Sequence, residues 1–155
     1  RSDQDRDARA VLTAMLIERA HKEVFTSVEL LNRDNATFLK SIGVDEIVVG
    51  DEYAASVIAA GTKHSGIVRV LDELLSSSYG NQFYKLELPA TLAGKPFAEL
   101  ATLLKEQHDA LLIGTEQRLP GGDKGNRKID VNPPRGHAIA AGDQLLVIAR
   151  KLPKL

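Results

Sequence analysis

Apolar and polar positions follow a helix–strand–helix–strand–helix order along the first third of the chain. Residues 3–21 carry apolar side chains at helical spacing, which predicts one helix with an apolar face. Residues 24–31 and 46–49 are short runs rich in β-branched residues, which predict strands. Between them, a helix is predicted to start at residues 32–34 and to end at Gly43. The residues expected to face the core are Ala8, Val11, Leu12, Met15 and Leu16 in the first helix and Ala36, Phe38, Leu39 and Ile42 in the second.

This order is typical of parallel strands joined by helical crossovers, so the first 50 residues are predicted to form a doubly wound α/β sheet. Two strands are too few for an independent sheet. Because the sequence opens on a helix, we expect residues 1–50 to be the second half of such a lobe. The first half, which would carry a phosphate-binding glycine loop, is not in this sequence.

Residues 51–77 read as a helical hairpin. Asp51 is expected to cap a helix that runs through Val57 and Ile58 to Gly61, and the run GTKHSG at 61–66 is a hinge before a second helix at about 65–77. Two short helices with apolar faces need something to cover them. Docking back on the parent sheet is one possibility, and a dimer contact through the hairpin is the one that we predict.

The pattern changes after SSSYG at 76–80, which is the best candidate for a domain boundary. Residues 81–155 then predict a β-α-β-β-β module of α+β class. Its strands are expected at 82–88, 110–116, 128–131 and 144–150, with a polar loop at 118–128. Its helix is expected to start at Pro96 and to turn inward Phe97, Leu100, Ala101 and Leu104. The run VNPPRGHAIAAGDQLLVIA at 131–149 predicts a proline loop, a Gly-Asp turn and the closing strand.

Composition narrows the function classes. Apolar residues make up 43% of the chain, charged residues 26%, and the net charge is −1, which is an ordinary soluble composition with no electrostatic case for nucleic acid. There is no cysteine, which excludes disulfides and thiolate metal sites. No run approaches the length of a membrane helix. If the protein serves a membrane, we expect another chain or segment to span it.

Motifs for catalysis are missing from the sequence. Neither GxGxxG nor GxxxxGK[ST] occurs, and the glycines of PGGDKGN, Gly121, Gly122 and Gly125, fit a hairpin loop better than a phosphate loop. The four histidines form no i, i+4 pair, and no serine lies in GxSxG. The chain is therefore not expected to be an enzyme.

Acidic residues offer one candidate site. In a doubly wound sheet the ligand crevice lies at the carboxyl ends of the strands, where the start of the first helix and Glu29 would meet. Carboxylates there suit a hard cation such as Ca²⁺. The alternative is that Asp3, Asp5 and Asp7 cap the helix and that Glu29 is simply exposed. A basic cluster of Lys124, Arg127 and Lys128 is either an anion site or a solvated loop.

Two stretches resemble a known family. LAGKPFAELATLLKEQHDALLIGTEQ followed by VNPPRGHAIAAGDQLLVIAR is similar to the C-terminal lobe of the regulator-of-potassium-conductance (RCK) family, the TrkA-C domain. The segment at 35–48 is similar to the second half of that family's N-terminal Rossmann-like lobe, and 51–77 to its helical crossover. The resemblance implies three parts: half of a Rossmann-like lobe at 1–50, a crossover and dimerisation hairpin at 51–80, and a TrkA-C-like lobe at 81–155.

The resemblance also implies a function. It points to a cytoplasmic, ligand-sensing domain at the inner face of the membrane that forms homodimers and rings and gates a potassium channel or transporter. In calcium-gated members one Asp and two Glu hold the ion. Asp3 and Glu29 match two of these positions, whereas Leu31 stands at the third and cannot ligate. NAD or another nucleotide would bind only through the N-terminal half that this sequence lacks.

Three hypotheses follow. The first is allosteric gating by a ligand such as Ca²⁺. The second is an oligomerising module of a transporter that has no ligand site of its own or binds a nucleotide such as cyclic di-AMP. The third, half of a dinucleotide oxidoreductase, lacks both the glycine loop and a catalytic constellation.

Overall fold

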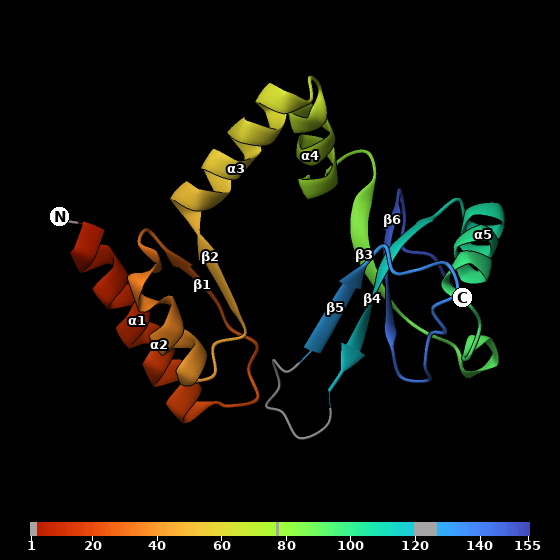
Figure 1. The fold of residues 1–155 in the computed structure, drawn as a ribbon. Helices are drawn as coiled ribbons and strands as arrows, with labels where there is room; N and C mark the ends of the chain where they lie inside the picture. Colours follow the sequence, from red (N-terminus) through yellow and green to blue (C-terminus); the bar gives the residue numbers. More distant parts are fainter. Residues whose placement is uncertain (1–2, 77, 120–126) are drawn as a thin grey trace. The chain divides into compact units, whose positions relative to one another are not determined.

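The computed structural model describes residues 3–76, 78–119 and 127–155 (Figure 1). They fall into two compact units that divide between Val68 and Arg69. Figure 1 shows a helix-covered pair of strands in the first unit and a larger antiparallel sheet in the second. Together they give the predicted fold class, an α/β part followed by an α+β part. No helix among the described residues is both long and apolar enough to cross a membrane.

The first unit is built on two parallel strands. Its elements are α1 (Asp3–Ala20), β1 (Ser27–Leu30), the 3-10 turn η1 (Arg33–Asn35), α2 (Ala36–Ser41), β2 (Glu46–Val49) and α3 (Gly50–Lys63). β1 pairs with β2 in register Ser27 to Glu46 through Leu30 to Val49. The predicted order is confirmed, and β2 has the predicted bounds. β1 is half as long as expected, since residues 24–26 precede the strand.

One face of this strand pair is covered and the other is bare. Leu30 on β1 and Val49 on β2 are buried against α1 and α2, which lie on the same side of the strands (Figure 1). The core residues are Ala14, Leu30, Ala36, Leu39, Val44 and Val49. The opposite face carries Ser27, Glu29, Glu46 and Val48, all exposed. A parallel sheet is normally covered on both faces, so this unit exposes surface that such a fold usually buries.

The predicted inward face of α1 is wrong in part. Leu12 and Leu16 are 56% and 64% exposed, and Ala8 is exposed as well. The side of α1 that faces the strands instead carries Asp7, Val11, Ala14 and Glu18, of which all but Val11 are buried. Buried carboxylates occupy this face because each has a hydrogen-bond partner on the strand side. Asp7 accepts from Leu31 and Glu18 accepts from the Thr26 hydroxyl.

Two further expectations for this unit are wrong. Phe38 is 44% exposed, because α2 is short and turns Ala36 and Leu39 inward instead. Asp51 does not cap α3, whose N-cap residue is Val49 and makes no side-chain capping bond. Gly43 does end α2, as predicted, with a left-handed φ of +99° that favours glycine.

Helices α3 and α4 (Ile67–Leu75) form the predicted hairpin elements. α3 continues through Gly61 to Lys63. A Cβ atom at Gly61 would lie 2.7 Å from Cγ2 of Val68, so any larger residue at this position would require the Val68 side chain to shift. Neither helix contains a buried residue. Their apolar side chains are therefore at most partly covered within the described part of the chain.

The second unit has the predicted β-α-β-β-β order. Its elements are β3 (Gln82–Glu87), the 3-10 turn η2 (Ala90–Leu92), α5 (Phe97–His108), β4 (Leu111–Arg118), β5 (Arg127–Val131) and β6 (Gln144–Ala149). The strands form one antiparallel sheet in the order β3-β6-β4-β5. α5 covers one face, and the predicted inward residues Phe97, Leu100 and Leu104 are buried there, with Ala101 packed beside them. The expected hairpin glycines Gly121, Gly122 and Gly125 lie outside the described residues.

The proline loop and the Gly-Asp turn before β6 hold α5 in place. Phe97 N donates to the His137 carbonyl at 2.8 Å, and Ala98 N donates to the Arg135 carbonyl at 3.1 Å. These bonds satisfy N–H groups that the first turn of a helix leaves without partners. The turn that follows has Gly142 at φ +89°, and the buried Asp143 accepts from Ala140 N at 2.9 Å. The stretch therefore closes the lobe, as its sequence predicts.

Candidate functional site

An open depression of about 740 Å³ lies at the carboxyl ends of β1 and β2. It is formed by the first turns of α1, the segment that leaves β1, and the first turn of α3. The polar residues that line it are Gln4, Asp7, Asn32, Asp34, Asn35 and Asp51, and the apolar ones include Val11, Leu12 and Leu31. This is the edge where ligands bind in doubly wound sheets, and three carboxylates lie along it, but Glu29, which the sequence predicts to lie there, does not line it.

Asp7 is the carboxylate that organises this crevice. It is 4% exposed, and its oxygens accept from Leu31 N and Asn32 N, each at 2.9 Å. Asp7 therefore caps the turn after β1 rather than the start of its own helix. The sequence predicts Asp7 among the acids at this edge, but its partners lie 24 and 25 residues away and cannot be identified from the local pattern.

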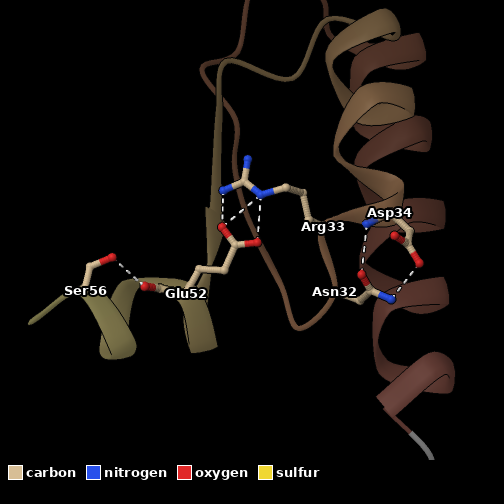
Figure 2. Close-up of polar contacts among 5 residues, drawn as sticks. All are labelled: Asn32, Arg33, Asp34, Glu52 and Ser56. Carbon is tan, nitrogen blue, oxygen red and sulfur yellow. Dashed lines mark hydrogen bonds and ion pairs between the residues drawn. The ribbon is translucent and has the colours of Figure 1, made fainter. Parts of the chain in front are cut away.

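Asn32 and Asp34 shape the next turn (Figure 2). The Asn32 side-chain oxygen accepts from Asp34 N at 3.0 Å, and its amide nitrogen donates to Asp34 Oδ2 at 2.7 Å. Asn32 is thus the N-cap of η1, with its own backbone extended. Arg33 lies within this turn, and its side chain extends to Glu52 of α3 (Figure 2).

Arg33 joins the crevice to α3 through Glu52. Arg33 Nε lies 2.7 Å from Oε1 and 2.8 Å from Oε2 of Glu52, and Nη2 also bonds Oε2 (Figure 2). The hydrogen bond from Arg33 lowers the pKa of Glu52, and the same bond raises the pKa of Arg33. Both side chains are exposed, so salt screens the pair. The contact joins η1 to the first turn of α3, and its bidentate geometry gives it a defined orientation.

The predicted metal ligands Asp3 and Glu29 stay a prediction. Asp3 is the first residue of α1, and its side chain lies outside the described part of the chain. Glu29 is exposed on the bare face of β1, and its carboxylate approaches the start of α3: a Cβ atom at Gly50 would lie 3.1 Å from Oε1. Leu31, at the third position, lines the crevice. Among the described side chains, no three carboxylates or histidines stand close enough together to hold a metal ion.

The basic cluster of Lys124, Arg127 and Lys128 is expected from the sequence to be either a solvated loop or an anion site. Lys124 lies outside the described residues, and Lys128 is exposed on β5. Arg127 is also on β5 and lies 2.7 Å from the buried carboxylate of Glu116. Arg127 therefore lies on a strand rather than in a loop, and one of its guanidinium nitrogens bonds a carboxylate. A depression of about 570 Å³ beside it mixes both signs of charge, since Glu87, Arg118 and Asp143 also line it.

No protein-family model matches the sequence, and no curated protein matches it. Solved structures do match. The human SLO3 gating ring has 18% sequence identity and a TM-score of 0.72, over 97% of this chain and 30% of that chain. The GsuK RCK domain (19%, TM-score 0.43) and the GsuK channel bound to NAD (18%, TM-score 0.45) each match 94% of this chain, and 29% and 24% of theirs.

The chain thus spans about a quarter to a third of the length of these structures. At this sequence identity, the similarity to the SLO3 gating ring concerns the fold. It confirms the predicted RCK-type fold, a Rossmann-like part followed by a C-terminal lobe.

Proposed function

We propose that this chain is a cytoplasmic regulatory module of the gating-ring type, which couples ligand binding to the opening of a potassium channel or transporter. The observation that carries the proposal is the similarity of nearly the whole chain to the human SLO3 gating ring. The sequence offers no motif for catalysis, which favours a regulatory role over an enzymatic one. The membrane-spanning part would belong to another segment or subunit.

A gating ring is an assembly, and α3 and α4 offer the surface for one. Four of their large apolar side chains are at least half exposed. They are Tyr53, Ile58, Val70 and Leu75, at 53%, 68%, 50% and 59%. Single exposed apolar residues are ordinary, but two successive helices without a buried residue are not. We propose that a second copy covers residues 51–77 and forms the homodimer from which a larger ring is built.

Substitution of Leu71 by Asp tests this contact, because a charge on the apolar side of α4 opposes burial. Light scattering of the variant should give a smaller oligomer than the parent chain gives. Asp72→Lys changes the charge of the neighbouring exposed residue and serves as the control, with the parent's mass expected. An unchanged mass for Leu71→Asp would remove α4 from the interface.

The ligand we propose first is Ca²⁺, bound at the carboxyl edge of the strands with Asp3 and Glu29 among its ligands. Two carboxylates supply at most four oxygens, whereas Ca²⁺ takes about six to eight. Leu31 adds no side-chain oxygen, and both oxygens of Asp7 already accept backbone N–H groups. The remaining ligands would be backbone carbonyls, water or a neighbouring subunit. A nucleotide such as NAD or cyclic di-AMP is the alternative ligand.

The Arg33–Glu52 ion pair offers a route from the crevice to the assembly. It links the turn that follows β1 to the first turn of α3, the helix that we place in the dimer contact. A ligand that moves this turn would change the position of α3. Such a ligand regulates only if it binds one arrangement of the assembly more tightly than the other.

Calorimetric titration of the parent chain, Asp3→Ala and Glu29→Ala with CaCl₂ tests the ligand. We expect heat of binding in the parent and its loss in both variants. Glu46→Ala removes another exposed carboxylate from the same bare face, at the opposite end of the strands, and should keep the heat. If the parent itself gives no heat, calcium is excluded, and the oligomer measured for Leu71→Asp decides whether the module assembles without it.

A further inference from the structure

Strand β5 forms an open edge of the second unit's sheet. The strand order is β3-β6-β4-β5, and no strand among the described residues pairs with the outer side of β5. Its side chains Ile129 and Val131 are 55% and 66% exposed. A free edge with exposed apolar side chains is a surface on which another strand can add.

The hydrogen bonds of β5 show which of its backbone groups are free to pair. Asn132 N donates to the Ile113 carbonyl of β4 at 2.8 Å. Backbone groups alternate along a strand, so Asp130 and Lys128 also direct theirs at β4. The N–H and C=O groups of Arg127, Ile129 and Val131 therefore point away from β4, at the open edge.

The side chains along this edge restrict how two copies of β5 can pair. In an antiparallel pair around a two-fold axis, outward groups must meet outward groups. If the axis passes through Ile129, Lys128 of each copy lies opposite Asp130 of the other copy, which gives two pairs of opposite charge. Moving the axis by one residue keeps the outward groups together but sets Lys128 opposite Lys128, or Asp130 opposite Asp130. Opposite charges across a strand pair stabilise it and like charges destabilise it, so one register is favoured.

We propose that the open edge of β5 is a self-association surface, on which β5 of a second copy adds antiparallel with Ile129 opposite Ile129. The pairing joins two four-stranded sheets into one eight-stranded sheet. Ile129 then has a paired strand on each side, β4 of its own chain and β5 of the second copy. Isologous contacts of this kind are the commonest in homo-oligomers. The other edge of the sheet, β3, has its one lysine engaged, since Lys85 lies 2.5 Å from Glu116.

This inference is independent of the proposed function, because it concerns a surface other than residues 51–77. The β5 contact uses none of the residues of the hairpin contact. Two different self-contacts on one chain extend a dimer into a larger assembly. The β5 contact can be tested whether or not the hairpin contact exists.

Single cysteines test the register directly, since the chain contains none. In the proposed pairing, the two Ile129 Cα atoms form a hydrogen-bonded pair about 5.5 Å apart, within the range of a disulfide. The two Val131 Cα atoms lie roughly 14 Å apart, because four residues of strand separate them. Ile129→Cys should therefore give a disulfide-linked dimer under mild oxidation at least about tenfold faster than Val131→Cys.

Val131→Cys is a matched control, because both positions are exposed on the same face of the same strand. Association through α3 and α4 would raise the local concentration of both thiols alike. Equal cross-linking rates for the two variants, or none for either, would overturn the proposal. Cross-linking of Val131→Cys alone would show that β5 pairs in a different register.

Charge exchange supplies the second test, in the Ile129→Cys background. Lys128→Asp sets Asp opposite Asp130 and should slow cross-linking by roughly tenfold. Lys128→Asp combined with Asp130→Lys restores opposite charges and should restore the parent rate. A double variant as slow as the single one would mean that β5 meets a surface other than its own copy, and the proposal would fail.

Discussion

The carboxylate of Glu116 on β4 lies 2.7 Å from the guanidinium of Arg127 on β5. The same carboxylate lies 2.5 Å from the ammonium of Lys85 on β3, so one side chain of 3% exposure connects three strands. Burial raises the pKa of Glu116, but the hydrogen bonds from Lys85 and Arg127 lower it by more. The net pKa is below the ordinary value for glutamate.

Acid should weaken the second unit through Glu116. Because its folded pKa is lower than the unfolded value of about 4.3, ionised Glu116 contributes stability that is complete above that pH and is lost as the pH falls through the folded pKa. Urea unfolding between pH 7 and pH 3 should show a smaller acid loss for Glu116→Gln than for the parent. At pH 7 we expect the variant to be less stable by about 1–2 kcal/mol.

Glu87→Gln is the control for this prediction. Glu87 is exposed on β3, opposite Gln144, and makes no ion pair among the described residues. Its variant should follow the acid dependence of the parent. If Glu116→Gln follows it too, the ion pairs of Glu116 contribute nothing to stability.

Asp7 should be the most costly acid to replace in the first unit. Asp7→Ala leaves the N–H groups of Leu31 and Asn32 without their carboxylate, which costs about 1–3 kcal/mol. Asp7→Asn keeps one acceptor oxygen and should lose less. Asp51→Ala is the control: Asp51 is exposed and caps nothing, so its change should stay within about 0.5 kcal/mol. Urea unfolding followed by far-UV circular dichroism measures all three, and equal losses for Asp7→Ala and Asp51→Ala would contradict the role of Asp7.

The neighbouring residues Phe38 and Leu39 should differ strongly on truncation. Leu39 has no exposed surface, so Leu39→Ala creates a cavity and should cost about 2–5 kcal/mol. Phe38→Ala removes a larger side chain but one that is 44% exposed, and should cost less than about 1.5 kcal/mol. The same unfolding measurement separates them. A greater loss for Phe38→Ala would mean that the phenyl ring is covered in solution.

Much of the fold could be predicted because its signals are local. β2, the end of α2 at Gly43, the inward residues of α5 and the Gly142 turn each follow from a few adjacent residues. The end of α3 differs from the prediction by two residues, although the signal used for it was also local. Gly61 reads as a helix stop, yet α3 continues to Lys63, and Gly61 instead lies where the Val68 side chain comes close.

The inward face of α1 could not be predicted, because its partners are distant in the sequence. Periodicity selects Leu12 and Leu16, which are apolar, over Asp7 and Glu18, which are not. The two acids are buried because Leu31, Asn32 and Thr26 offer hydrogen bonds to them. The Arg33–Glu52 pair of the candidate site has the same origin: its residues are 19 positions apart, and charged residues at that spacing carry no signal of contact.

Gly114 of β4 should tolerate no side chain, since the backbone of the neighbouring strand β5 comes very close to it. A Cβ atom there would lie 2.5 Å from the Asp130 carbonyl oxygen and 3.2 Å from Cα of Val131, both backbone atoms that can move only with the strand. Gly114→Ala should therefore displace β5 and cost about 1–3 kcal/mol. Gly136→Ala is the matched control, because a Cβ atom at Gly136 meets no atom within 4 Å among the described residues. Thermal unfolding should show a lower midpoint for Gly114→Ala alone, and hydrogen exchange should show faster exchange at residues 127–131. Parent-like exchange there, together with an unchanged midpoint, would mean that β5 does not lie against Gly114 in solution.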